Sequence, residues 1–189
     1  TISYELNKLL TGARVDKSFQ PTNDTVVMRF HKAGYGRIDL VMQAGVRLHI
    51  SQYPLENPLT PPSFPMLLRK RVKGANVISI KQHEFDRVVE IKMQKEQNYT
   101  LIVELFDKGN IILLVEEKNI ILPLKRKHVG NRDISSKKIY EFPAQHGMNP
   151  ITINLLEFND LIRYSDSDIV RTLARNGLGS LYAEEIISH

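Results

Sequence analysis

Between residues 76 and 125 the chain is a succession of short apolar segments separated by turn-forming residues, and this pattern limits the fold more than any other. The segments are NVISIKQ (76–82), DRVVEIKM (86–93), YTLIVELF (99–106), NIILLVEE (110–117) and NIILPLK (119–125). Each has the length and the alternating side chains of a strand. Asp107-Lys108-Gly109 and the region around Lys118-Asn119 have turn chemistry. We therefore predict an antiparallel meander with one face exposed to water.

Upstream of the meander, three further segments predict strands: TVVMRF (25–30), RIDLVM (37–42) and VRLHIS (46–51). The first two flank HKAGYG, whose two glycines favour a hairpin turn. The first residues, TISYELNKLLTG, place apolar side chains at helical spacing and reach a glycine at position 12. This predicts a helix that ends near Gly12.

The segment NPLTPPSFPMLLRKRVKGA (57–75) predicts a helix whose charges have a single sign. Ser63 or Thr60 is a candidate N-cap, and Pro65 would lie in the first turn. Apolar side chains, among them Met66 and Leu67, are expected to face the core. The basic side chains are left for the exposed arc and form a candidate site for an RNA backbone: Arg69, Lys70, Arg71 and Lys73. A solvated helix face is the other interpretation of such a charge run.

A second basic run follows the meander at Lys125, Arg126 and Lys127. It opens a polar stretch that continues to Pro150 and is typical of a long loop or linker. Two blocks of positive charge, in a chain of formal net charge +5, favour a nucleic-acid backbone as partner. The chain has no tryptophan and few other aromatic residues, which argues against an exposed base-stacking platform.

Composition and motifs argue against several other kinds of site. The chain has no cysteine, so disulfides and thiolate metal sites are excluded, and its six histidines form no pair with metal-ligand spacing. Apolar runs such as IILLV (111–115) are too short to span a bilayer, and no signal peptide is recognisable. A cytoplasmic location is expected. The sequence has no phosphate-binding glycine-rich loop, Ser-His-Asp set or paired catalytic carboxylates, so no enzyme class is indicated and neither a cofactor nor a small-molecule substrate is expected.

After Pro150 the sequence becomes helical, and GLGSLYAEEI (177–186) matches the G-h-G-x-x-x-A-x-x-h pattern of helix-hairpin-helix motifs. Gly177 and Gly179 would allow a tight turn, and Ser180 would cap the second helix. The N–H groups at that helix start would then bind a phosphate. An ordinary helix–helix turn fits the same residues. We expect a β-rich domain over residues 1–148 and a helical region over residues 149–189.

Arg87 is unusual if DRVVEIKM forms a regular strand. Alternation would place its guanidinium on the same face as Val89 and Ile91, where it would need a partner or a ligand. The alternative is that Arg87 lies at the end of the strand and reaches water.

In this order, ELNKLLTGARVDKSFQP, RLHIS, NPLTPPSFPMLLRKRVKGA, FDRVVEI, KGNIIL and LARNGLGSLYAEEI resemble the N-terminal module of the NFACT proteins. These are the RqcH/NEMF-like factors of ribosome-associated quality control, some of them labelled fibronectin-binding in bacteria. The resemblance extends over nearly the whole chain. It implies an α+β fold like that of the formamidopyrimidine-DNA glycosylases: a β-rich, sandwich-like N-terminal domain with flanking helices, followed by a helix-hairpin-helix region.

The resemblance also implies a function. NFACT factors bind the large ribosomal subunit obstructed by a peptidyl-tRNA, recruit aminoacyl-tRNA, typically alanyl-tRNA, and support untemplated C-terminal tailing. Asp86 and Arg87 match the family's DR motif, which implies tRNA engagement. The family's functional aspartate near the N-terminus would fall before Thr1, and LARNGLG is shorter than the usual family hairpin. The chain is expected to be an N-terminal fragment without the family's coiled coil and C-terminal parts.

Two other functions stay open. A DNA glycosylase of this fold needs an amine nucleophile, usually an N-terminal proline beside a carboxylate, and often a zinc ribbon. The chain starts TISYE and has no cysteine, which weighs against that chemistry. A fibronectin-binding surface protein would need an export signal or an anchor, and the sequence shows neither.

Overall fold

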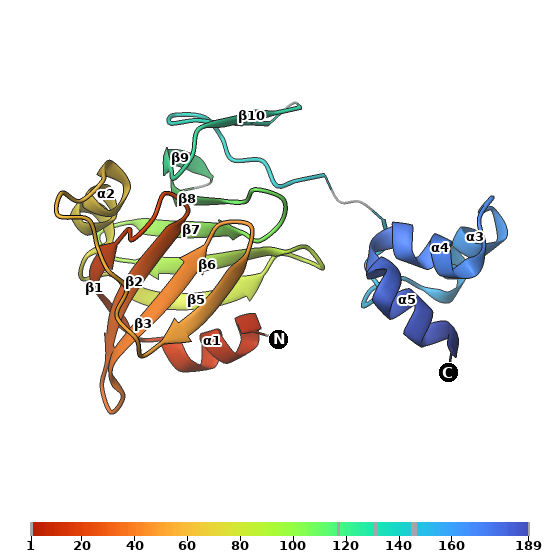
Figure 1. Ribbon diagram of the computed structural model, residues 1–189, viewed down its shortest axis with the longest axis horizontal. Helices are drawn as coiled ribbons and strands as arrows, with labels where there is room; N and C mark the ends of the chain where they lie inside the picture. The colour runs from red at the N-terminus through yellow and green to blue at the C-terminus, as the bar shows by residue number, and fades with distance from the viewer. Residues whose placement is uncertain (1, 117, 131, 145–146, 189) are drawn as a thin grey trace. The chain divides into compact units, whose positions relative to one another are not determined.

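The structure, a computed structural model, describes residues 2–116, 118–130, 132–144 and 147–188. It is an α+β protein whose chain divides into two compact units (Figure 1). The first unit comprises the residues up to His83 together with Arg87–Phe142, and the second comprises Glu84–Asp86 and the residues from Pro143 onward. The chain passes between the units after Phe142, close to the boundary at residue 148 that composition suggested.

The first unit is built on a nine-stranded sheet of order β4-β3-β2-β1-β5-β6-β7-β8-β9. All neighbouring strands are antiparallel. The strands are β1 (Arg14–Phe19), β2 (Thr25–Lys32), β3 (Gly36–Gln43), β4 (Arg47–Ser51), β5 (Asn76–Gln82), β6 (Val88–Gln94), β7 (Asn98–Glu104), β8 (Asn110–Val115) and β9 (Asn119–Pro123). The predicted meander and the predicted hairpin are confirmed, and pairing of β1 with β5 joins the two halves of the sheet.

The core lies between these two halves, because the sheet curves until its first strands face its last ones (Figure 1). Alternation along the strands explains which side chains enter it. Every second residue of β2 and of β6 belongs to one buried cluster: Val26, Met28, Phe30, Val89, Ile91 and Met93. The intervening residues of β2 and β3 form an outward face, which carries the charges described below.

Two helices flank the sheet. α1 (Ile2–Leu10) packs on β5 with Leu6 and Leu10 buried, and it ends as predicted before Gly12, whose φ is +80°. α2 (Ser63–Val72) packs on β1. Two details of α2 were predicted wrongly. The N-cap is Pro62, with no side-chain cap, because the proline already holds the extended backbone that precedes a helix. Met66 is half exposed, because the buried face is formed by Phe64, Leu68 and Val72 instead.

Residues 125–142 are not a linker, contrary to the prediction. β10 (Lys127–Val129) pairs with β11 (Arg132–Ile134), and Ile134 and Tyr140 are buried in a second apolar cluster with residues of β6, β7 and β8. So few core side chains in a polar stretch give no periodic pattern, which is why the sequence did not reveal them.

The second unit is helical. Its elements are α3 (Leu155–Arg163), α4 (Ile169–Leu173), the kinked segment η1 (Ala174–Leu178) and α5 (Gly179–Ser188). α3 begins with a capping box, in which Asn154 accepts from the N–H of Glu157 and Glu157 accepts from the N–H of Asn154. No helix in the described ranges is both long enough and apolar enough to cross a membrane.

Candidate nucleic-acid interface

Helix α2 exposes three of the four cations predicted on it. Lys70, Arg71 and Lys73 are exposed, whereas Arg69 is half-buried. The Nε of Arg69 donates to the carbonyl oxygen of Ser18 at 2.8 Å, and its guanidinium lies 5.5 Å from the ring centre of Phe19. Arg69 therefore holds α2 onto β1. The prediction that Arg69 lies on the exposed arc with the other basic side chains is corrected, because its position on the helix flanks the buried face.

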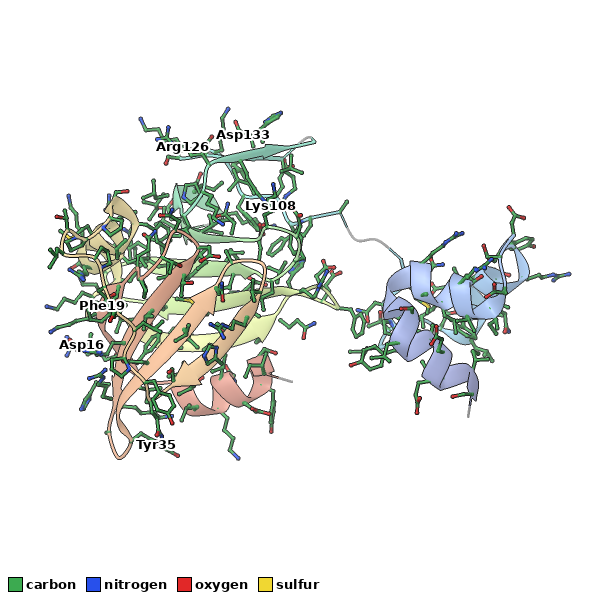
Figure 2. All side chains as sticks on the ribbon, viewed as in Figure 1. Asp16, Phe19, Tyr35, Lys108, Arg126 and Asp133 are labelled. Atoms are coloured by element: carbon green, nitrogen blue, oxygen red, sulfur yellow. The ribbon has the colours of Figure 1, made fainter. Side chains whose placement is uncertain are left out.

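Two of the three cations of the second basic run lie near carboxylates. The Nζ of Lys127 lies 3.6 Å from the carboxylate of Asp107. A hydrogen bond from Thr22 is the main reason that the pKa of the Asp24 carboxyl lies below its ordinary value, and the charge of Lys125 lowers this pKa further. Of the three cations of this run, Arg126 alone is exposed, and Figure 2 shows it at the margin of the first unit.

Arg87 precedes β6 and is exposed. It therefore does not share the buried face of Val89 and Ile91, and the alternative that it reaches water at the strand end is confirmed. Its backbone is fixed, because its carbonyl accepts from the N–H of Leu105 at 2.7 Å. Asp86 lies in the same bend and is half-buried. The pair thus occupies a shaped connection between β5 and β6, where adjacent side chains need not point in opposite directions.

The glycine-rich turn in the second unit has the backbone that only glycine adopts readily. Gly177 has φ +109°, and Gly179 has φ +75° and ψ 161°. The N–H of Gly179 donates to the carbonyl of Ala174, so it is already used within the turn. Ser180 lies inside α5, after Gly179, and is not the N-cap. The predicted capping by Ser180 is corrected, whereas phosphate contact at this turn stays a prediction.

The outward face of β2 and β3 holds a charged cluster that the sequence did not predict. Asp39 is nearly buried, with 8% of its surface exposed, and accepts hydrogen bonds from Arg29 and Arg37. Partial burial acts to raise the pKa of the Asp39 carboxyl, but the hydrogen bonds and charges of both guanidiniums outweigh it and hold this pKa below its ordinary value. The signal in the sequence is the i, i+2 spacing of Arg37 and Asp39, which becomes informative only with the strand register that sets Arg29 opposite Asp39.

Comparison with known proteins places this architecture in a family. The model of a family described as NFACT N-terminal and middle domains matches residues 1–189. The chain belongs to the NFACT family. The archaeal Rqc2 homolog aRqcH of Methanocaldococcus jannaschii is 38% identical over 194 residues, which cover 96% of this chain and 29% of that protein. The ribosome quality control complex subunit NEMF of Homo sapiens is 32% identical over 144 residues, 75% of this chain and 13% of that protein.

The first relative is thus an Rqc2 homolog and the second a subunit of the ribosome quality control complex, and the chain spans less than a third of the length of either. Solved structures share the fold. The N-terminal domain of the fibronectin-binding protein PavA of Streptococcus pneumoniae matches with TM-score 0.84 at 27% identity, covering 99% of this chain and 79% of that one. The N-terminal part of the fibronectin/fibrinogen-binding protein of Streptococcus suis matches with TM-score 0.85 at 28% identity, covering 100% and 76%. The resemblance inferred from sequence segments is confirmed.

Proposed function

We propose that this chain is the RNA-binding module of a cytoplasmic ribosome quality control factor. In this proposal the factor binds the obstructed large ribosomal subunit and tRNA, and it supports untemplated C-terminal tailing of stalled chains. Kinship with NFACT quality control factors is the observation that carries the proposal. Peptide-bond formation would belong to the ribosome, so the chain would act by binding, without a catalytic residue or a cofactor of its own.

The exposed cations supply the contact with RNA phosphates. Lys70 and Arg71 extend from α2, and Lys73 is the residue that follows it as its C-cap. The start of this helix is fixed by Pro62 and Pro65, and its buried face packs on the sheet. Because the helix backbone is already fixed, only the side chains themselves lose conformational entropy on binding. Each phosphate that they neutralise releases condensed counterions, which makes affinity depend steeply on salt.

Salt dependence tests this contact. Changing Lys70, Arg71 and Lys73 together to Gln should weaken binding of tRNA to the chain. It should also make the negative slope of log affinity against log salt shallower by about two to three, since each lost phosphate contact removes about 0.9 from its magnitude. Binding measured at several salt concentrations checks both. Arg69→Gln is the matched control, because Arg69 faces β1 and should leave the slope almost unchanged. An equal slope in wild type and triple variant would exclude α2 as the RNA contact.

We propose that the Asp86–Arg87 connection binds tRNA, with alanyl-tRNA as the partner that the family resemblance implies. Arg87 is exposed and suits a phosphate or a base edge. Asp86 only accepts hydrogen bonds when ionised, so it suits a ribose hydroxyl or a base amine and would repel a phosphate. The two residues therefore have different tasks.

Replacing both residues of this pair with Ala should abolish tRNA recruitment and tailing in the full-length factor and leave large-subunit binding intact. The fold should survive, because Arg87 is exposed and its structural bond is made by the backbone; we expect a loss of about 1 kcal/mol or less, a few degrees in Tm. Tailing assays and ribosome co-sedimentation on the same preparation check both expectations. Normal tailing by a folded double variant would refute the assignment.

The helical unit is proposed to act as a helix-hairpin-helix element, and the first unit to share the fold of the N-terminal domain of formamidopyrimidine-DNA glycosylases. For phosphate contact, Gly177 and the N–H of Ser180 in the first turn of α5 remain candidates. Fibronectin binding is a second candidate function, favoured by the names of the solved neighbours. Titration of the chain with fibronectin, beside tRNA, would separate the two.

A further inference from the structure

The outward face of β1, β2 and β3 is basic. Register sets Lys17 opposite Arg29, Arg29 opposite Asp39, and His31 opposite Arg37. These five residues comprise four basic side chains and one carboxylate, and a second carboxylate, Asp16 of β1, acts electrostatically on Arg37. The side chain of Arg37 is available to a partner, because it is 54% exposed.

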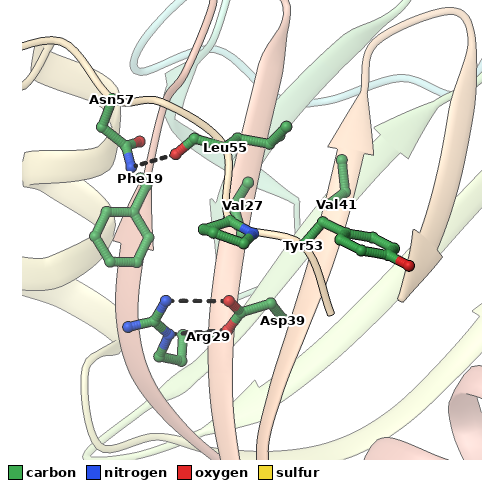
Figure 3. Close-up of a pocket in the computed structure, with 9 residues that line it drawn as sticks. Phe19, Val27, Arg29, Asp39, Val41, Tyr53, Leu55 and Asn57 are labelled. Carbon is green, nitrogen blue, oxygen red and sulfur yellow. Dashed lines mark hydrogen bonds and ion pairs between the residues drawn. The ribbon is translucent and has the colours of Figure 1, made fainter. Parts of the chain in front are cut away.

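Beside the Arg29–Asp39 pair lies a pocket of about 190 Å³ (Figure 3). Val27 and Val41 of adjacent strands line it from the sheet, and Phe19 of β1 lines it from one side. Tyr53 and Leu55 line it from the extended segment that follows β4. The pocket therefore joins apolar walls to a charged end.

A second, more open hollow of about 620 Å³ adjoins the first, since Asp39 and Pro54 line both. Arg37 and Tyr35 are among its lining residues. The side chain of Arg37 is 54% exposed, whereas that of Arg29 is 20% exposed. Arg29 therefore lines the smaller pocket, and the more exposed Arg37 lines the open hollow.

Hydrogen-bond counting shows what this cluster can bind. Asp39 accepts two bonds from Arg29, at 2.8 and 3.0 Å, and two from Arg37, at 2.7 and 3.3 Å. A carboxylate has about four lone-pair sites, so Asp39 is saturated and acts by orienting the guanidiniums. Each guanidinium has about five N–H donors and gives two to Asp39, which leaves about three on each. The cluster thus offers N–H donors, and although the charge of Asp16 also acts on Arg37, these donors suit an acceptor-rich group such as a phosphate.

We propose that this face binds one unpaired nucleotide of an RNA, with the base in the 190 Å³ pocket and its phosphate on Arg37 in the open hollow. The pocket is smaller than the ~300–1000 Å³ typical of sites for drug-sized ligands, so it has room for a planar ring but not for a whole nucleotide. Its apolar walls suit the faces of a base, and the N–H groups of Arg29 suit base oxygens and ring nitrogens. The base would sit in a pocket, which requires no exposed aromatic platform.

This inference rests on the proposed RNA-binding function but uses different residues from the cations of α2. A peptide carboxylate could use the same donors. Nothing in that binding would require the remaining basic side chains of the face, however, Lys17 among them. An RNA strand uses all three features, and NFACT relatives are ribosome quality control factors.

Three hairpin RNAs test the site: one fully paired, one with a single bulged nucleotide, and one with an abasic residue at the bulge. The last two carry the same phosphates, so their difference in affinity for the 189-residue chain measures the base alone. We expect the bulged RNA to bind roughly tenfold more tightly than the abasic RNA, within the range for a base held against protein side chains.

Variants locate the effect. Val41→Phe fills the pocket and should bring the ratio of the two affinities close to one. Arg37→Gln should weaken binding of both bulged and abasic RNA several-fold, since it removes the phosphate contact. Arg47→Gln is the matched control: it removes the same charge from the outward side of neighbouring β4 but lines neither hollow, and it should have a smaller effect.

Equal affinity of the wild-type chain for bulged and abasic RNA would overturn the nucleotide site, whether or not Val41→Phe folds. An unchanged ratio of bulged to abasic affinity in folded Val41→Phe would overturn it as well. So would a short peptide with a free C-terminal carboxylate that displaces the bulged RNA from the wild-type chain but not from Arg37→Gln. The proposed function would stand in each case if the paired hairpin still binds and loses affinity in the Lys70, Arg71 and Lys73 variant. Failure of all three RNAs to bind would contradict both.

Discussion

Gly109→Ala is expected to destabilise the first unit by more than about 4 kcal/mol, a loss at the upper end of the range for point substitutions. Gly109 has φ +51° in the turn between β7 and β8. A Cβ there would overlap the amide nitrogen of Gly45 and would lie 2.5 Å from both the carbonyl carbon of Ala44 and the carbonyl oxygen of Glu104. All three obstacles are backbone atoms, so no side chain can move aside, and the hydrogen bond from the N–H of Gly45 to Glu104 at 2.9 Å would be strained as well.

Gly34→Ala is the matched control for this prediction. Gly34 also lies in a hairpin turn with positive φ, +82°, but a Cβ there would meet nothing within 4 Å. Its replacement should cost about 1 kcal/mol from backbone conformation alone. Thermal unfolding should show a fall of about 2–4 °C for Gly34→Ala and ~10 °C or more for Gly109→Ala. Similar falls in Tm for the two variants would mean that the turn at Gly109 does not pack against the turn at Gly45.

The turn that contains Gly109 shows which parts of the fold could be predicted from the sequence. The turn at 107–109 was predictable because glycine and aspartate are local signals, and strand alternation is a local signal as well. The packing of this turn on residues 44–46 was not predictable, because it joins positions more than sixty residues apart through backbone atoms that carry no sequence pattern. Burial of Tyr140 was missed for a related reason, since one aromatic residue in a polar stretch has no period.

In the candidate interface, too, some features could be predicted from the sequence and others could not. Exposed Lys70, Arg71 and Lys73 followed from the pattern of the helix, because they avoid its apolar stripe. Arg69 and Lys127 were misjudged, because each is held by a partner distant in sequence: the carbonyl of Ser18 and the carboxylate of Asp107. A run of like charges is visible in the sequence, whereas the partner that binds each charged side chain is known only once the fold is known.

Glu104 is the other position where a large effect is expected. Its side chain, 2% exposed, lies 2.6 Å from the guanidinium of Arg132 and accepts from the hydroxyl of Tyr140 at 3.0 Å. Burial, and after it the charge of Glu104, raises the pKa of the Tyr140 hydroxyl, so this group stays protonated and can donate. The network attaches β11 and the segment after it to β7.

Glu104→Ala should therefore cost about 3–5 kcal/mol, because it leaves the largely buried Arg132 without its counter-charge and Tyr140 without its acceptor. Glu104→Gln keeps an acceptor oxygen and removes only the charge, so its cost should be smaller. Glu96→Ala is the control: its pair with Lys95 spans 3.8 Å, the Glu96 side chain is 85% exposed, and it should cost less than about 1 kcal/mol.

Hydrogen exchange adds a local measurement to thermal unfolding. The N–H of Tyr140 donates to the carbonyl of Lys118, and the N–H of Ile120 donates to the carbonyl of Lys138. In Glu104→Ala both amides should exchange faster than those in the middle of β2, because the segment loses its ionic attachment before the sheet opens. If Glu104→Ala and Glu96→Ala melt together and exchange alike, apolar packing of Ile134 and Tyr140 holds this segment on the sheet and the ion pair does not.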